Sequence, residues 1–338
     1  MKNLVSVPIR VLVTGTRGKS ALVRLLQAGV SSLGIPAWGR VTGVLPREIG
    51  PKRERIIERS GCGHVGEMRW WLRQVPPGDG AVILENGAVS PELQGLAARW
   101  LGPTLVVWTN SRADHLESWG PGRRSAETAL LQGIPPFSAV AAGAEVACSS
   151  FVRVELEKRG CRLESPPPVN TCRSGFGAEN LSLAKLAMTL LGLDAEKAGH
   201  AMEGLSPDLA DFSVIREGGG VLAQAFSAND VQSAAGIWES LGWEARETVL
   251  LYNHRPDRPA RLKSFTAWAK NLPWMGMCLM GPFGFGLFDR VSLERVRIST
   301  AEDLRRFVGE KKRVFGCGNV AGVPIRYLEE RRAGKHGA

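Results

Sequence analysis

The sequence predicts an α/β protein whose first domain is built on a parallel sheet. Short apolar segments that read as strands alternate with segments of helical period, beginning with Val11–Val13 and Leu22–Leu33. Three strand-like segments are followed by polar residues, Lys19, Glu85 and His115. Because functional loops of such folds follow the carboxyl ends of the strands, these side chains are expected to converge at one edge of the sheet.

Length and composition favour a soluble protein with two domains. The chain has 338 residues, 44% hydrophobic and 22% charged, which is typical of a globular protein of this size. No signal peptide is readable, since Lys2 and Arg10 bracket only a short apolar stretch. The uncharged run Asn271–Phe288 contains prolines and glycines, so we interpret it as a buried strand and loop. A cytoplasmic protein is expected, with any membrane association made through a partner.

Charge and cysteine content narrow the partners. The net charge of +10 suits polyanions such as nucleotides, nucleic acid, anionic lipids or acidic polymers, without choosing among them. Much of it lies in Lys52–Arg59 and Arg326–Lys335, which are either solvated helix faces or binding patches. The six cysteines have no CxxC spacing, and Cys62 with His64 is the one metal-like pair. Reduced thiols are a better interpretation of the six cysteines than a metal site.

The segment Val11–Ser20, VLVTGTRGKS, predicts a phosphate-binding loop. An apolar strand leads through a glycine turn to a helix N-terminus, where backbone N–H groups and the helix dipole attract an anion. Lys19 adds a full charge, and the Ser20 hydroxyl can bind Mg²⁺. The common GxxxxGK[ST] pattern would need glycine in place of Val13, so this is a narrower variant. The residues expected to contact nucleotide are Thr16, Arg17, Gly18, Lys19 and Ser20.

Further elements follow in the first half of the chain. A short strand is expected near 36–38, and the charged run 52–59 reads as the start of a helix. A helix over 67–75, broken by prolines and glycine after it, should bury Trp70, Trp71 and Leu72. Ser90 and Pro91 suit the N-cap and first turn of a helix that ends near 100. Buried strands are expected at 81–84 and 104–108.

In the second half of the chain, predicted strands again alternate with predicted helices after a shift in composition. A glycine turn leads into a helix within 175–193, and 203–220 reads as a linker. We therefore expect one domain over 1–210 and a smaller one over 211–338. The later strands are expected at 221–226, 248–252, 277–280, 295–298 and 313–315, with helices from 230, 259 and 301.

Several motifs together resemble the Mur ligase superfamily of ATP-dependent amide ligases, and most closely the CapB/PgsB poly-γ-glutamate synthase group. The resemblance implies a central P-loop ATPase domain with a parallel sheet and a C-terminal Rossmann-like domain. The motifs are TGTRGKS, VTGVLPREI, LENGAVSPELQ, TNSRADHLESWGP, FSANDVQS, NHRPDR and FGCGNVAG, in order along nearly the whole chain.

This resemblance implies that ATP and Mg²⁺ are the cofactors. In such ligases a carboxylate attacks the γ-phosphate of ATP, and an amine then displaces phosphate from the acyl phosphate. Lys19, Glu85 and His115 would be catalytic, and Ser20, Glu85 and His115 would hold the metal. Chemistry alone makes His115 an unexpected Mg²⁺ ligand, and an orienting histidine is the alternative. Asn180 matches the asparagine aimed at adenine; its alternative is a helix N-cap.

In the second domain, two expected strands are followed by polar residues suited to nucleotide or substrate. They could form a site at the strand ends, or a surface cluster of ion pairs. They are Asn229, Asp230, Arg255, Asp257 and Arg258.

The sequence also departs from its relatives. Only ten residues precede the first strand, which disfavours a nucleotide-sugar substrate; the usual hydrophobic N-terminal segment of poly-γ-glutamate synthases is missing too. The span Leu116–Pro135 has no lysine that could be carbamylated, so a second metal site is in doubt. The motif that often reads AND-P has Val231 in place of proline.

The leading hypothesis is a ligase joining glutamate units, with glutamate or a γ-glutamyl chain as acidic substrate. One alternative is a ligase for another acidic acceptor, such as a folate-like, cofactor or peptide carboxylate. Another is a P-loop ATPase or a nucleotide-binding scaffold subunit of a polymer exporter. A membrane protein partner for polymer synthesis is expected, and a nucleic-acid partner is not.

Overall fold

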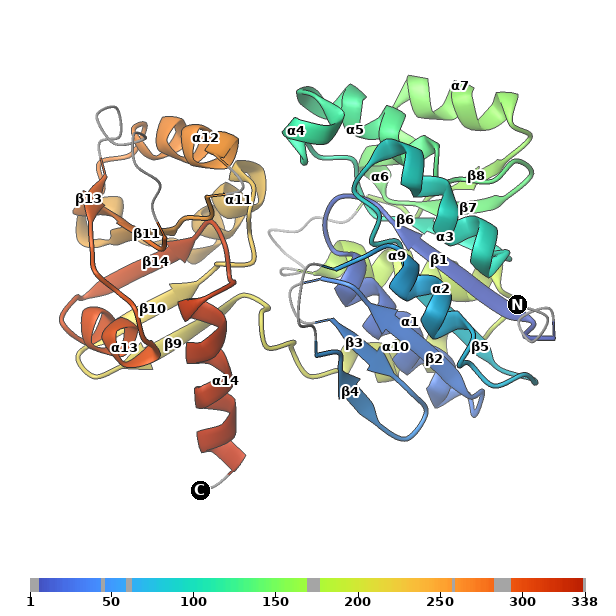
Figure 1. Ribbon diagram of the computed structural model, residues 1–338, viewed down its shortest axis with the longest axis horizontal. Helices are drawn as coiled ribbons and strands as arrows, with labels where there is room; N and C mark the ends of the chain where they lie inside the picture. Colours follow the sequence, from blue (N-terminus) through green and yellow to red (C-terminus); the bar gives the residue numbers. More distant parts are fainter. Residues whose placement is uncertain are drawn as a thin grey trace. The chain divides into compact units, whose positions relative to one another are not determined.

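The chain divides into two compact units, Met1–Ser206 and Pro207–Ala338. The computed structural model describes residues 6–43, 46–58, 63–168, 177–256, 259–282 and 293–336. Each unit is an α/β domain with its own sheet (Figure 1). The division falls a few residues before the boundary expected from composition.

The sheet of the first unit has eight strands in the order β4-β3-β2-β5-β1-β6-β7-β8. The six strands β2, β5, β1, β6, β7 and β8 pair in parallel with their neighbours. At the β2 edge, β3 pairs antiparallel with β2, and β4 pairs antiparallel with β3. The α/β class and the parallel sheet were predicted. The strand bounds are β1 Ile9–Thr14, β2 Ala37–Val41, β3 Arg47–Ile49, β4 Glu54–Ile56, β5 Ala81–Glu85, β6 Leu105–Trp108, β7 Ala139–Ala142 and β8 Arg162–Glu164.

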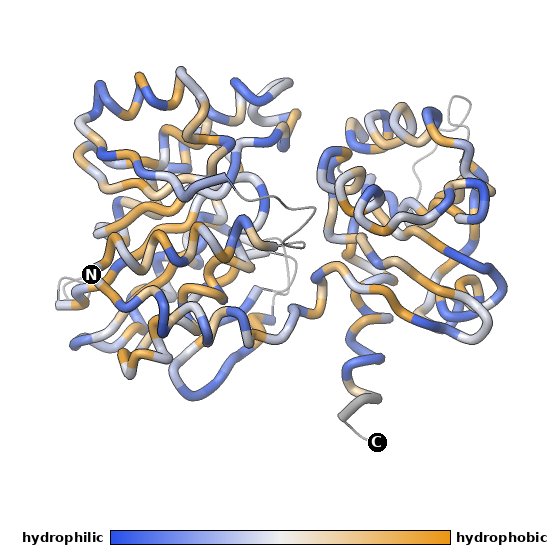
Figure 2. The backbone as a smooth tube through the Cα atoms, turned by 180° about the vertical axis from the view of Figure 1, so that it is seen from behind, coloured by the Kyte–Doolittle hydropathy of each residue, from blue (hydrophilic) through white to orange (hydrophobic). Residues whose placement is uncertain are grey.

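Helices cover both faces of this sheet because alternate strand residues point to opposite sides. Val11 and Val13 pack in the core with α1, α9 and α10, whereas Leu12 packs in the core with α2, α3, α5, α6 and α7. Figure 2 shows hydrophobic residues, in orange, along the strands of each unit. The helix bounds are α1 Lys19–Ser32, α2 Gly66–Leu72, η2 Pro91–Leu93, α3 Gln94–Leu101, α4 Leu116–Trp119, α5 Gly122–Leu131, α6 Ala144–Ala147, α7 Ser150–Lys158, α9 Ala178–Leu190 and α10 Ala195–Glu203.

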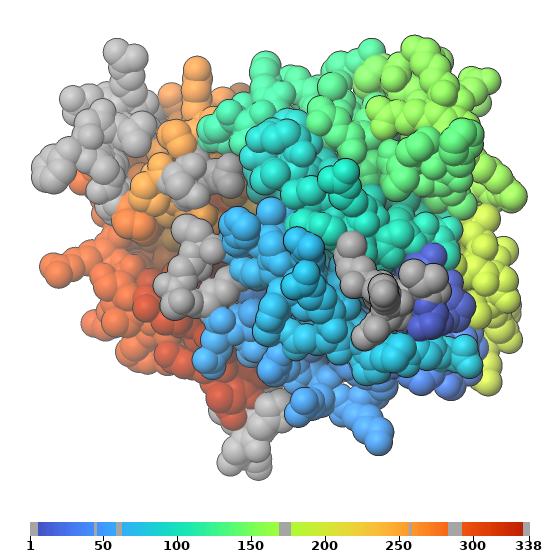
Figure 3. Space-filling view, turned by 45° about the vertical axis from the view of Figure 1, so that its right-hand side comes forward, coloured from blue at the N-terminus to red at the C-terminus, as the bar shows by residue number. Residues whose placement is uncertain are grey.

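Two expectations for the first unit were wrong. The charged run expected to start a helix instead contains strand β4, which pairs with β3 through cross-strand ion pairs such as Arg55–Glu48 at 2.7 Å. Trp70 is 57% exposed, while Trp71 and Leu72 face the core as expected. The segment carrying β3, β4 and α2, in blue, forms part of the surface seen in Figure 3.

The second unit has six strands in the order β13-β12-β11-β14-β10-β9, all parallel except the edge strand β9. Helices α13 and α14 cover one face, and α11 and α12 the other. The expected linker contains β9. The bounds are β9 Ser213–Glu217, β10 Gly220–Gln224, α11 Val231–Leu241, η3 Ala245–Glu247, β11 Val249–Asn253, α12 Pro259–Ala269, β12 Gly276–Met280, β13 Glu294–Arg295, α13 Ala301–Gly309, β14 Arg313–Cys317 and α14 Val323–His336.

Over the part of the chain that the structure describes, no helix has both the length and the apolar character needed to cross a membrane.

Candidate active site

The loop expected to bind phosphate, hereafter the phosphate loop, joins β1 to α1 in the first unit and contains two glycines on which its shape depends. Gly15 has φ 124° and Gly18 has φ 77°, in a region that side chains with a Cβ rarely adopt. A Cβ on Gly15 would also lie 2.1 Å from Thr109 Oγ1. The glycine turn therefore holds the loop against the end of β6 and leaves the α1 N-terminus as an anion cradle.

Lys19, the first residue of α1, folds back over this loop. Its Nζ donates hydrogen bonds to the carbonyl oxygens of Gly15 at 2.6 Å and Thr16 at 3.2 Å. Burial of the ammonium lowers the pKa of Lys19, while the carboxylates of Glu85 and Asp114 act in the opposite direction. The side chain thus lies at the loop where a phosphate would bind.

Ser20 and Glu85 form the second part of the site. Parallel pairing of β1 with β5 sets Val13 opposite Glu85, which brings the carboxylate beside the phosphate loop. Ser20 Oγ lies 3.0 Å from Glu85 Oε2, and the same oxygen accepts the Thr42 N–H at 2.9 Å. A hydroxyl and a carboxylate are the donors that Mg²⁺ prefers, so these residues fit part of an octahedral shell.

The rest of such a shell would come from water and phosphate oxygens. Among residues with described positions, no three His, Cys, Asp or Glu side chains cluster as a metal site. Cys62 lies outside those positions, and His64 Nδ1 accepts the Gly66 N–H at 3.0 Å.

His115 lies in a group centred on Asp114, on the loop after β6. Asp114 Oδ2 is 3.1 Å from Arg17 Nη1 and 3.3 Å from His115 Nε2. One carboxylate oxygen therefore links the phosphate loop to the histidine. His115 has φ 48°, an uncommon conformation outside glycine, and its ring packs on Trp119 with centroids 4.9 Å apart.

Asn180 lies directly over the phosphate loop. A Cβ on Gly18 would approach Asn180 Nδ2 to 2.8 Å. The N-cap of α9 is Gly177, so the cap alternative for Asn180 is wrong. Contact with adenine stays a prediction.

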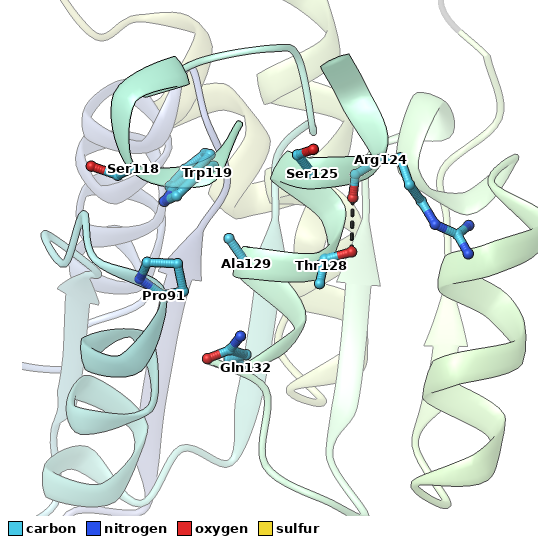
Figure 4. Close-up of a pocket in the computed structure, with 8 residues that line it drawn as sticks. All are labelled: Pro91, Ser118, Trp119, Arg124, Ser125, Thr128, Ala129 and Gln132. Carbon is cyan, nitrogen blue, oxygen red and sulfur yellow. Dashed lines mark hydrogen bonds between the residues drawn. The ribbon is translucent and has the colours of Figure 1, made fainter. Parts of the chain in front are cut away.

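A small pocket is lined in part by Trp119. It has a volume of about 210 Å³, and Figure 4 shows the Trp119 ring over it, with Pro91 on one side and residues of α5 opposite. The Trp119 indole N–H donates to Val89 O at 2.5 Å. Trp119 thereby ties the His115 segment to the loop that follows Glu85.

Several residues that brace these loops were not assigned a role from the sequence. Asn86 Nδ2 donates to Gln94 O and Oε1, both at 3.1 Å, and steadies the turn after Glu85. Asn110 contacts Thr16 and Arg17 across the strand ends. Asn86 directly follows β5, and Asn110 lies two residues beyond the end of β6. Both occur in motifs quoted above, and their place at the strand ends was the sequence signal that could have indicated these roles.

In the second unit, the loops after β10 and β11 carry the expected polar residues. Asp230 caps α11, accepting the Ser233 N–H at 2.9 Å. Asn229 Oδ1 is buried, and no donor among the described residues lies within hydrogen-bonding distance of it. Arg255 is half-buried beyond the end of β11. Asp257 and Arg258 lie outside the described residues.

Asn253 links two loops at the same strand ends by hydrogen bonds. Asn253 Nδ2 donates to Asn319 O at 2.6 Å and Ala321 O at 2.9 Å, which joins the loops after β11 and β14. Gly318, at φ 99°, allows the approach, since a Cβ there would lie 2.6 Å from the Tyr252 ring. This edge is the place where an open parallel sheet receives a ligand.

The chain is similar in sequence to proteins of the CapB group. Residues 211–333 match the family described as the poly-gamma-glutamate synthase CapB C-terminal domain. The PGA synthase CapB of Bacillus subtilis (strain 168) and the capsule biosynthesis protein CapB of Bacillus anthracis are each 26% identical over 283 residues, covering 78% of this chain. The resemblance to the CapB group is confirmed. The match spans 72% of the B. subtilis CapB and 61%, less than two thirds, of the B. anthracis CapB.

Solved structures with the same fold cover nearly all of the chain. The bifunctional folylpolyglutamate synthase/dihydrofolate synthase of Yersinia pestis CO92 has TM-score 0.69 and 15% identity, over 99% of this chain and 91% of that one. E. coli FolC in complex with ADP has TM-score 0.67 and 16% identity, over 98% and 91%. MurF of Acinetobacter baumannii has TM-score 0.65 and 13% identity, over 98% and 77%. The likeness is one of fold, and it confirms the predicted Mur-ligase-like class.

Proposed function

We propose that the protein is an ATP-dependent ligase that joins a carboxylate to an amine, with glutamate or a γ-glutamyl chain as the acid. The observation that carries the proposal is the Ser20–Glu85 pair beside the phosphate loop. The related B. subtilis protein is named PGA synthase CapB. A solved folylpolyglutamate synthase/dihydrofolate synthase of this fold, at TM-score 0.67, holds Mn, AMPPNP and L-glutamate. These names support an acidic amino acid as substrate.

The phosphate loop would hold the triphosphate of ATP. The first N–H groups of α1 have no partner within the helix and face an anion. Lys19 would leave the Gly15 and Thr16 carbonyls and place its ammonium on the transferring phosphoryl group. Positioning and charge neutralisation are the main needs of phosphoryl transfer.

The chemistry then follows two steps. A carboxylate oxygen of the acid attacks the γ-phosphorus, and the bond to ADP breaks. The amine attacks the carbonyl carbon of the resulting acyl phosphate and loses a proton, and inorganic phosphate leaves with the oxygen that came from the acid. No protein nucleophile is needed in either step.

Ser20 and Glu85 would hold Mg²⁺, with His115 as the third residue expected from the sequence. A bound divalent ion neutralises phosphate charge and orients the oxygens of the transferring group. The Thr42 N–H holds Glu85 in place. Asp114 orients His115 and Arg17 together.

The second unit would bind part of the substrate at its strand ends. A guanidinium can hold a carboxylate through two hydrogen bonds, and Arg255 and Arg258 are the candidates. Asn229 and Asp230 are the candidates for nucleotide contact. A membrane protein partner for polymer synthesis belongs to the same proposal.

The test is a screen of ADP release over amino acids, with and without hydroxylamine. A ligase releases ADP strongly only with a suitable acid, and hydroxylamine traps an acyl phosphate as a hydroxamate that mass spectrometry detects. Glutamate is expected to give the largest signal. ADP release that needs no acid would instead favour an ATPase, and nucleotide binding without turnover would favour a scaffold subunit.

A further inference from the structure

The side chain of Asn110, on the loop after β6, forms hydrogen bonds with the phosphate loop. Asn110 Oδ1 accepts hydrogen bonds from Thr16 Oγ1 at 2.7 Å and from the Arg17 N–H at 3.0 Å, and Asn110 Nδ2 donates to Arg17 O at 3.2 Å. The Asn110 carbonyl oxygen also accepts the Thr16 N–H at 3.1 Å. A single side chain therefore meets both polar backbone atoms of Arg17 and the hydroxyl of Thr16.

Strand register explains why this residue reaches the loop. Parallel pairing of β1 with β6 sets Thr14 opposite Trp108. Two residues further on, Thr16 and Asn110 leave the sheet side by side. The Trp108 indole N–H donates to the Asn110 carbonyl oxygen at 3.2 Å, which holds the Asn110 backbone in place.

These bonds decide which amides face a ligand. Because Asn110 Oδ1 occupies the Arg17 N–H, the N–H groups that point at an anion begin after Arg17, at the N-terminus of α1. Without the side chain, the Arg17 N–H, the Arg17 carbonyl oxygen and the Thr16 hydroxyl each lose a hydrogen bond, and the backbone at Arg17 can rotate. Gly18, which follows it at φ 77°, offers little resistance to such rotation.

We propose that Asn110 is a positioning residue that fixes the backbone on both sides of Arg17, so that the amides after it converge on a phosphate. The inference rests on the proposed function, because it concerns the same nucleotide site. It assigns Asn110 no contact with the reacting atoms. Its effect is expected on phosphate affinity, which can be measured without turnover.

The experiment measures binding of ADP and of inorganic tripolyphosphate to the full chain by calorimetry. Asn110→Ala is expected to weaken both about 10- to 100-fold, since partly buried groups left without a hydrogen bond are costly. Asn110→Ser keeps a smaller polar group, so its affinity for both probes should lie between those of the unaltered chain and of Asn110→Ala. The serine variant tests the inference if the alanine variant does not fold.

Thr104→Val is the matched control. Thr104 also bridges β1 and β6, accepting the Arg10 N–H at 3.0 Å and donating to Arg10 O at 3.2 Å, but at the amino ends of the strands. Its loss should lower the melting temperature and leave phosphate affinity unchanged. Asn110 variants that bind tripolyphosphate within twofold of the unaltered chain, or no more weakly than Thr104→Val, would overturn the inference. If the unaltered chain binds neither probe, the proposed function itself fails.

Discussion

Ser20 Oγ lies 3.0 Å from Glu85 Oε2, although 65 positions separate the two residues in the chain. The contact exists because β1 and β5 are parallel neighbours whose carboxyl ends meet at one edge of the sheet. It places a hydroxyl and a carboxylate beside the amides of the α1 N-terminus. That combination of oxygen donors and anion-binding amides suits a metal–nucleotide complex.

Glu85→Gln is expected to raise the Mg²⁺ concentration needed for ADP release about 10- to 100-fold, because a carboxamide is a weaker metal ligand than a carboxylate. The measurement is ADP release against Mg²⁺ at saturating ATP. Glu164→Gln is the control, since Glu164 ends strand β8 of the same sheet but pairs with Arg162 at the surface. Identical Mg²⁺ curves for Glu85→Gln and the unaltered chain would exclude Glu85 as a ligand.

Lys19→Ala should lower ADP release by ~10²–10³-fold, the usual cost of losing one group that stabilises developing charge. The fold should stay intact, because the hydrogen bonds of Lys19 within the described part of the chain go to carbonyls of its own loop. Lys185→Ala, which breaks an exposed ion pair with Glu203, should change neither activity nor melting temperature appreciably. Near-normal ADP release by Lys19→Ala would contradict the phosphate-loop assignment.

In the protein without nucleotide or metal, Lys19 is expected to lose its proton at a pH below 10.5, because burial disfavours the ammonium. Folding then favours the neutral amine. The charged form costs folding free energy at neutral pH, and this cost is relieved as pH rises from the folded-state pKa to 10.5. NMR of labelled lysine side chains, assigned with Lys19→Arg, measures the titration. A Lys19 pKa at or above the ordinary lysine value would contradict the burial argument.

Trp119→Phe should lower kcat about two- to tenfold while changing the KM for ATP little, since it removes one hydrogen bond, to Val89 O, and keeps a ring against His115. Steady-state kinetics measures the split between the two constants. Trp70→Phe on the exposed side of α2 is the control. Equal effects of the two substitutions would mean that Trp119 does not position the histidine.

Arg255→Ala should raise the KM for the acid by about 10- to 100-fold and the KM for ATP far less, as expected when a charged hydrogen-bond partner of a carboxylate is lost. Kinetics with glutamate and ATP varied in turn makes the comparison. Arg246→Ala, an exposed arginine before β11, serves as control. A rise shared equally by both substrates would favour a surface role.

The phosphate loop and the strands beside it could be predicted because each is a local signal. An apolar run, a glycine turn and a helical period fixed β1 and α1, and Glu85 followed from its place at the end of β5. Strands β3 and β4 were missed since their charged residues mask the strand pattern. Arg47 and Glu54 pair at 2.5 Å across the antiparallel edge, and sequence spacing alone carries no sign of that partner.

Asn110 illustrates a second limit. Its motif was readable, but its role depends on the register of β1 against β6, which sets it beside Thr16. The direction of Trp70 was missed for a different reason. An apolar residue in a short helix such as α2 was expected to face inward, whereas only Trp71 and Leu72 reach the core.

The central claim is that the acid substrate is activated by ATP through its own carboxylate oxygen. The most direct measurement uses glutamate labelled with ¹⁸O in its carboxylates, with ATP, Mg²⁺ and an amine, and mass spectrometry of the inorganic phosphate released. An acyl phosphate predicts one ¹⁸O atom in each phosphate formed with product. Phosphate released in step with product but free of ¹⁸O would contradict the account.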